Sequence, residues 1–153
     1  MKFKFPLQKV LEHRKIKEDL AQKDFQDALD VLLKLEGKLK QLEDQEDDAR
    51  VRSFALQSEG GTAAPSLIQI DEYLRNSKVL LQMQRSKIAE QQAIVENKRA
   101  VLIAAAVETK AISTFKDKKF TEFKAKAEKE EQNEMDEQSV LRFKTNDRKD
   151  EAS

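Results

Sequence analysis

The chain has 153 residues, of which 39% are hydrophobic and 38% charged, and its 29 basic side chains balance 29 acidic ones. A formal net charge of zero gives the chain no overall field that would attract DNA, RNA or an anionic membrane. Because the sequence has no cysteine, disulfides, thiol nucleophiles and cysteine-based zinc sites are excluded. Three Gly, two Pro and no Trp complete a composition typical of long helices and coiled coils.

The first third of the chain carries a heptad repeat. Eleven of the fifteen positions reached in alternating steps of four and three residues are apolar. The positions are Leu7, Leu11, Arg14, Glu18, Ala21, Phe25, Ala28, Leu32, Leu35, Leu39, Leu42, Glu46, Ala49, Ser53 and Leu56. Low hydropathy with many charges is also typical of disorder, but a repeat sustained in this way indicates a coiled-coil seam. It predicts a helix from about residue 7, just after Pro6, to about residue 57.

A short break with Gly and Pro separates this helix from a second one. Residues 58–66 contain Gly60, Gly61 and Pro65, and Gly60 is well placed to take the left-handed conformation that ends a helix. Ser66 with Gln69 fits a capping box, which predicts a helix over residues 67–144. One apolar residue recurs every seven along it, at Leu67, Leu74, Leu81, Ile88, Val95 and Leu102.

A turn this short makes the two helices antiparallel neighbours. The predicted fold is therefore all-α, a coiled-coil hairpin over residues 1–146 whose longer second helix projects past the first. Residues at one level have numbers that add up to about 123, which places Leu7 opposite Lys116 and Phe3 opposite Phe120. We expect residues 147–153 to be disordered.

Polar residues of the predicted seam fix its register at a cost in stability. They are Arg14, Glu18, Glu46, Gln84, Gln91 and Lys98. The acidic run over residues 43–48 falls level with Arg75, Lys78 and Arg85, which supports the same antiparallel register through surface ion pairs.

The sequence offers little material for catalysis. Its one histidine, His13, lies two residues after a seam position and is expected to face solvent. Without cysteine or a Gly-rich loop, neither a catalytic triad nor a phosphate-binding loop nor a transition-metal site can be assembled. We therefore expect no enzyme, no cofactor and no metal. The longest apolar run, Val101 to Val107, is too short to cross a membrane, which favours a cytoplasmic protein.

Three surface patches are candidates for partner binding. Phe3 and Phe5 either cover the open end of the seam or form an insertable tip. The lysine-rich run from Lys110 to Lys129 is interpreted first as a solvated face and second as a site for an acidic partner; nucleic-acid binding is disfavoured. A third patch widens the apolar stripe and predicts either docking of another protein or self-association. Its residues are Tyr73, Leu80, Ile94 and Val101.

Both ends of the chain resemble the FliJ family, the small component of the bacterial flagellar type III export apparatus. The opening Phe3-Lys4-Phe5-Pro6-Leu7-Gln8-Lys9-Val10-Leu11, followed by Arg14, is similar to the family pattern F-x-F-x-L-x-x-V-L-x-x-R. The segment Glu131-Gln132-Asn133-Glu134-Met135-Asp136-Glu137, with Arg142, resembles E-x-K-x-x-D-E…R, although Asn133 stands where the family has Lys.

The resemblance implies a cytoplasmic stalk for bacterial flagellum biogenesis and protein transport, which regulates an ATPase and has a chaperone-associated role in motility. Its partners would be the hexameric export ATPase, the cytoplasmic domain of the export gate and export chaperones, with no nucleic acid and with the inner membrane approached only through these partners. The implied ATPase-binding residues are Phe3, Phe5, Leu7, Leu11, Arg14, Asp136, Glu137 and Arg142. The implied export-gate-binding residues, nearer the turn, are Leu42, Gln45, Ala49, Tyr73, Leu80 and Gln84.

Two alternatives remain open from the sequence. The chain could be a self-associating structural coiled coil, for example a four-helix dimer, whereas the stalk is expected to be a monomer. It could also be the equivalent stalk of a virulence-type secretion system.

Overall fold

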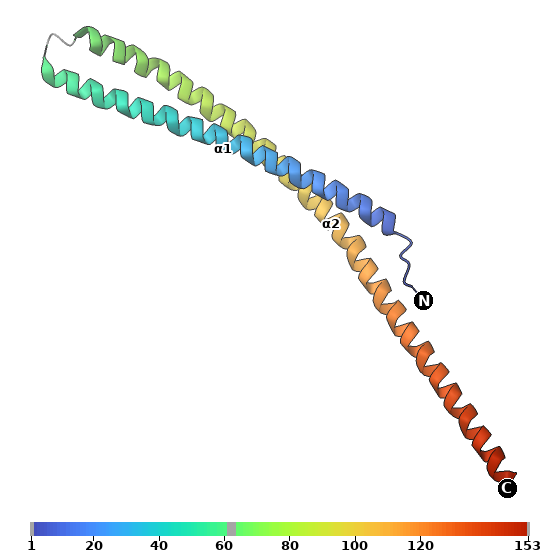
Figure 1. Cartoon of the computed structure of the whole chain (residues 1–153). Helices are drawn as coiled ribbons and strands as arrows, with labels where there is room; N and C mark the ends of the chain where they lie inside the picture. The colour runs from blue at the N-terminus through green and yellow to red at the C-terminus, as the bar shows by residue number, and fades with distance from the viewer. Residues whose placement is uncertain (1, 61–63, 153) are drawn as a thin grey trace. The chain divides into compact units, whose positions relative to one another are not determined.

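The computed structural model describes residues 2–60 and 64–152, which form two α-helices, α1 over Gln8–Glu59 and α2 over Ala64–Glu151 (Figure 1). α2 is the longer helix, with 88 residues against 52 in α1. The chain divides into two units, one formed by Ile16–Ala106 and the other by Met1–Lys15 together with Val107–Ser153. Each helix contributes a segment to both units; the single hairpin domain over residues 1–146 stays a prediction.

In the Ile16–Ala106 unit, α1 and α2 lie side by side and run in opposite directions (Figure 1). The side-chain amide of Gln84 donates a hydrogen bond to the carbonyl of Leu35 at 2.9 Å, and that of Gln91 donates to the carbonyl of Ala28 at 3.0 Å. The residue numbers in both pairs add up to 119, which is within about one helical turn of the expected 123 and constant from pair to pair, as in two neighbouring antiparallel helices. The all-α antiparallel hairpin is confirmed.

Burial follows the heptad repeat. Every position of the first series from Leu11 to Leu56 is buried or half-buried, and so is every apolar position of the second series from Leu67 to Leu102. Ala28 of α1 and Val95 of α2 are both buried and lie at about one level of the seam, since their numbers add up to 123. A small side chain opposite a branched one lets the helices pack closely at this level. Each buried aliphatic side chain stabilises the pair by about 1.5–2 kcal/mol.

Leu7 departs from the predicted seam. α1 begins at Gln8, and Leu7 remains 37% exposed. Because Leu7 precedes the helix, helical spacing does not place it on the seam. Phe5, 8% exposed, is buried instead, and its carbonyl accepts a hydrogen bond from the Gln8 amide at 3.1 Å. Lys116 contacts Gln8, the residue next to Leu7, so the expected level of Lys116 is correct to within one residue.

The two helix ends next to the turn differ in how well the sequence predicted them. Gly60 has a φ of 91°, the left-handed conformation expected after the last residue of α1. α2 begins at Ala64, with Pro65 in its first turn, where proline is well tolerated. Ser66 is thus inside the helix, and the predicted cap is wrong. Gly61 to Ala63 of the predicted turn lie outside the described residues.

At its other end α2 continues to Glu151 rather than ending near Lys144, so residues 147–151 are helical where the sequence favoured a disordered tail. This segment has neither Gly nor Pro to stop a helix. Arg148 and Lys149 in the last turn interact favourably with the helix dipole. Within residues 2–60 and 64–152, neither helix has a stretch long and apolar enough to cross a membrane.

Candidate partner-binding surfaces

An aromatic cluster fixes the N-terminal segment to α2 in the unit of Met1–Lys15 and Val107–Ser153. The ring of Phe3 lies 5.4 Å from that of Phe120, nearly perpendicular to it, and 5.4 Å from that of Phe123. The Phe5 ring lies 6.0 Å from the Phe115 ring. Edge-to-face and tilted arrangements at these distances are favourable. The expected pairing of Phe3 with Phe120 is confirmed.

Hydrogen bonds continue this junction along the first turns of α1. Lys116 Nζ donates to Gln8 Oε1 at 2.7 Å. Thr109 Oγ1 donates to the Arg14 carbonyl at 3.2 Å, while Arg14 Nη1 donates to the Glu108 carbonyl at 3.1 Å. The half-buried Arg14 therefore holds α1 against α2 and has only part of its guanidinium available to a partner.

Beyond Phe123 the character of α2 changes. Every described residue from 124 to 152 is exposed, so this segment is a helix that no other described part of the chain covers. Asp136 and Glu137 lie here beside Val140 and Leu141, around a shallow surface depression of about 380 Å³. Val140 is 53% and Leu141 63% exposed. Apolar side chains next to carboxylates on an unpartnered helix are typical of a surface that a second protein covers.

The eight residues expected at the ATPase all belong to this unit, but they form two groups. Phe3, Phe5, Leu7, Leu11 and Arg14 lie in or near the junction with α2, whereas Asp136, Glu137 and Arg142 are exposed on the helix beyond it. Phe5 and Leu11 are buried. These two side chains therefore shape the junction from within rather than offering a contact surface.

A family model described as flagellar FliJ protein matches residues 3–148, which is nearly the whole chain. The chain belongs to the FliJ family. It is therefore a component of the flagellar export apparatus. Comparison with curated proteins and with solved structures gives no match.

The residues expected at the export gate of this FliJ-family chain lie in the Ile16–Ala106 unit, and half of them are available at the surface. Gln45, Tyr73 and Leu80 are exposed, Tyr73 to 41% and Leu80 to 51%. Leu42 is half-buried, and Ala49 and Gln84 are buried in the seam. The last three support the pairing of the helices, and any docking surface here is built from the first three.

Sequence reasoning assigned no role to several exposed apolar residues of this FliJ-family chain. Val140, Leu141 and Phe143 stand out in a segment that is otherwise mostly polar, and this contrast was the available signal. Phe54, 74% exposed on α1, and Val51 beside it carried no such signal, because apolar residues are frequent around them. His13 is exposed, as expected. No group of three or more metal-ligating side chains gathers in the described part of the chain.

Proposed function

We propose that this chain is a non-enzymatic stalk of the flagellar export apparatus, which inserts its paired termini into the hexameric export ATPase and couples that ATPase to the export gate. One observation supports this most: α2 continues for several turns beyond the aromatic junction with every described residue from 124 to 152 exposed. Insertion into a second protein would stabilise a long helix that exposes Val140 and Leu141 to solvent, because their apolar surface is then removed from water.

A single helix also has no rotational symmetry. Inside a six-fold ring it must contact each subunit differently, and these unequal contacts bias the subunits towards different conformations. This is the physical basis on which a stalk could promote ring assembly and sequential hydrolysis. The aromatic junction around Phe3 and Phe115 would mark the point at which the pairing of α1 with α2 ends and α2 continues alone.

At the other unit, Gln45, Tyr73 and Leu80 would form the contact with the cytoplasmic domain of the export gate. Tyrosine supplies a large contact area with a polar tip, which suits a protein interface. Binding of export chaperones and a cytoplasmic location at the inner membrane, reached through the apparatus, belong to the same proposal.

The proposal is tested by ATPase stimulation with purified export ATPase. Deleting residues 124–153 removes the exposed helix but keeps the junction with Phe120 and Phe123, so we expect the shortened chain to stay helical and to lose stimulation. A full-length variant carrying Val140→Glu and Leu141→Glu should lose most of it as well, because two charges replace the exposed apolar contact.

The matched control carries Ala125→Glu and Ala127→Glu, which add the same charge at exposed positions of the same helix and should keep at least about half of the stimulation. Undiminished stimulation by the shortened chain would contradict the proposal.

A second candidate is a self-associating structural coiled coil, favoured by four exposed apolar side chains along one flank of α2. Their exposed fractions lie between 41% and 51% for Tyr73, Leu80, Ile94 and Val101. Light scattering after size exclusion distinguishes the two candidates, because the stalk is expected to be a monomer. A stable dimer that Ile94→Glu with Val101→Glu converts to a monomer would favour self-association.

A further inference from the structure

A basic groove lies between α1 and α2 in the Ile16–Ala106 unit. Two pockets of about 390 Å³ and about 360 Å³ adjoin one another there and share Arg50 of α1 and Lys78 of α2. The first also has Arg75, and the second has Arg85. Each pocket thus has three cationic side chains against one carboxylate, which is Asp71 in the first and Glu46 in the second.

Ion pairs within the unit neutralise only part of this charge. Arg85 Nη2 lies 3.5 Å from Glu43 Oε1, and Arg50 pairs with the buried carboxylate of Glu46. Arg75 and Lys78 form no ion pair within the described residues. The expectation that the acidic run over residues 43–48 would engage all three cations of α2 is therefore correct for Arg85 alone.

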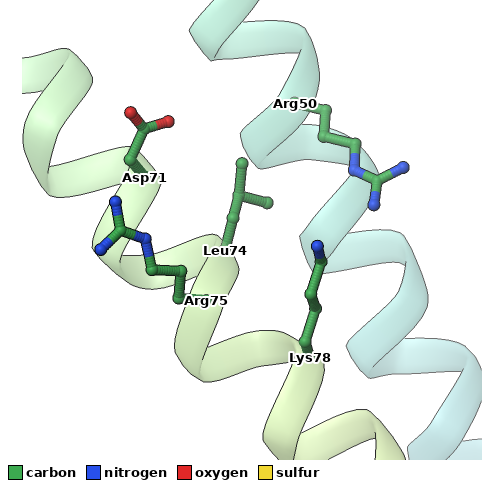
Figure 2. Close-up of a pocket in the computed structure, with 5 residues that line it drawn as sticks. All are labelled: Arg50, Asp71, Leu74, Arg75 and Lys78. Carbon is green, nitrogen blue, oxygen red and sulfur yellow. The ribbon is translucent and has the colours of Figure 1, made fainter.

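The arrangement of the side chains leaves the two unpaired cations open to a ligand. Figure 2 shows Leu74 pointing from α2 towards α1, with Lys78 extending on the same side towards Arg50. Arg75 lies next to Asp71 on α2 (Figure 2), without an ion pair between them. The half-buried Leu74 and the buried Leu81 provide an apolar floor between the charges.

These features favour a polypeptide over a nucleotide. The residues that line the two pockets include no aromatic ring on which a base could stack. Cations spaced along a shallow groove with an aliphatic floor match a segment that offers successive carboxylates and one apolar side chain. At 3.6 residues per turn, Arg75 and Lys78 lie on the opposite flank of the Leu74–Leu81 line from Tyr73 and Leu80, so the groove is a separate surface.

We propose that the basic groove binds an acidic segment of a partner protein, whose carboxylates pair with Arg75 and Lys78 and whose apolar side chain rests on Leu74. A second copy of this chain is the less favourable occupant. Its own acidic segment, residues 128–137, belongs to the other unit, so the contact would be heterologous and would build open chains rather than a closed dimer. The inference stands independently of the stalk function, because it uses none of the stalk's contact residues.

The test uses fluorescence anisotropy to measure the binding of a fluorescein-labelled synthetic peptide. This peptide has glutamate at every fourth position and a leucine between successive glutamates. A peptide of the same sequence with glutamine in place of glutamate is the ligand control. We expect the full chain to bind the acidic peptide about tenfold more tightly than its glutamine counterpart, with affinity falling as salt is added. Arg75→Glu with Lys78→Glu should weaken this binding by about tenfold.

The protein control carries Lys23→Glu and Lys34→Glu, which change the net charge equally at exposed positions of the same unit and should leave the affinity within about twofold. Circular dichroism checks folding, and Arg75→Gln with Lys78→Gln replaces the charge-reversal variant if that variant unfolds. Equal binding of both peptides, equal loss in both double variants, or displacement of the peptide by inorganic phosphate at similar concentration would each overturn the proposal. A mass above the monomer in light scattering that Arg75→Glu with Lys78→Glu returns to the monomer would overturn it as well, because a second copy would then occupy the groove.

Discussion

Individual residues decide how the two helices meet and where they end. Gln84 and Gln91 each donate to a carbonyl of α1, and a donor in an otherwise apolar seam favours one register over its heptad-shifted alternatives. These roles could be predicted from the sequence, because polar residues interrupt an apolar repeat at fixed spacing. The exposure of Leu7 could not be predicted from the sequence, because it depends on whether α1 begins one residue earlier or later.

Gly37 is a residue whose replacement should stabilise the protein. It lies inside α1, and a Cβ added there would meet no atom within 4 Å. Gly37→Ala should raise the free energy of unfolding by about 0.5–1 kcal/mol, because alanine loses less backbone entropy in a helix. Urea unfolding followed by circular dichroism measures the change.

Gly60→Ala is the matched control. Gly60 also has open space around its Cβ position, but its φ is 91°, which costs an L-residue about 1–2 kcal/mol. This variant should therefore be less stable than the parent chain. Destabilisation by Gly37→Ala, or equal effects at both positions, would contradict the assignment of Gly37 to an open helical site.

At the scale of elements, aromatic contacts join the N-terminal segment to α2. They lie next to the part of the seam where Arg14 and Glu18 stand in place of large apolar residues. The pairing of Phe3 with Phe120 could be predicted from the antiparallel register alone. The burial of Phe5 against Phe115 required the structure, because Phe5 precedes the helix and follows no heptad. The helical end of α2 was missed because few charged segments without an apolar face stay helical alone.

Phe5→Ala should loosen this junction. Phe5 is 8% exposed, and removing a buried phenylalanine costs about 3–5 kcal/mol, here within the unit that contains the termini. We expect faster amide hydrogen exchange over residues 8–15, whereas exchange around Leu81 in the other unit should change little.

Phe54→Ala provides the comparison, because the Phe54 side chain is 74% exposed and its loss should change the free energy of unfolding by about 0.5 kcal/mol or less. If the two substitutions accelerated exchange over residues 8–15 to the same extent, the aromatic junction would not be what holds the N-terminal segment.

At the scale of the whole molecule, the sequence predicted the fold class and the family because both depend on features spread along the chain. The heptad repeat predicts the two long helices, the short turn between them predicts their antiparallel pairing, and the family model matches residues 3–148. The candidate surfaces were harder to predict, because Ala49, Leu11 and Phe5 were assigned to partners but are buried. The basic groove at Arg75 and Lys78 was not predicted, because opposite charges at one level were expected to pair with each other.

The stalk proposal makes its most direct prediction for site-specific cross-linking. Because the chain has no cysteine, Leu141→Cys and Val79→Cys each create a unique attachment point for a photoreactive maleimide, and both side chains are exposed, at 63% and 60%. With assembled export ATPase, the probe at position 141 should cross-link to ATPase subunits and the probe at position 79 should not. Cross-linking from position 79 with none from position 141 would contradict the insertion of the C-terminal helix into the ring.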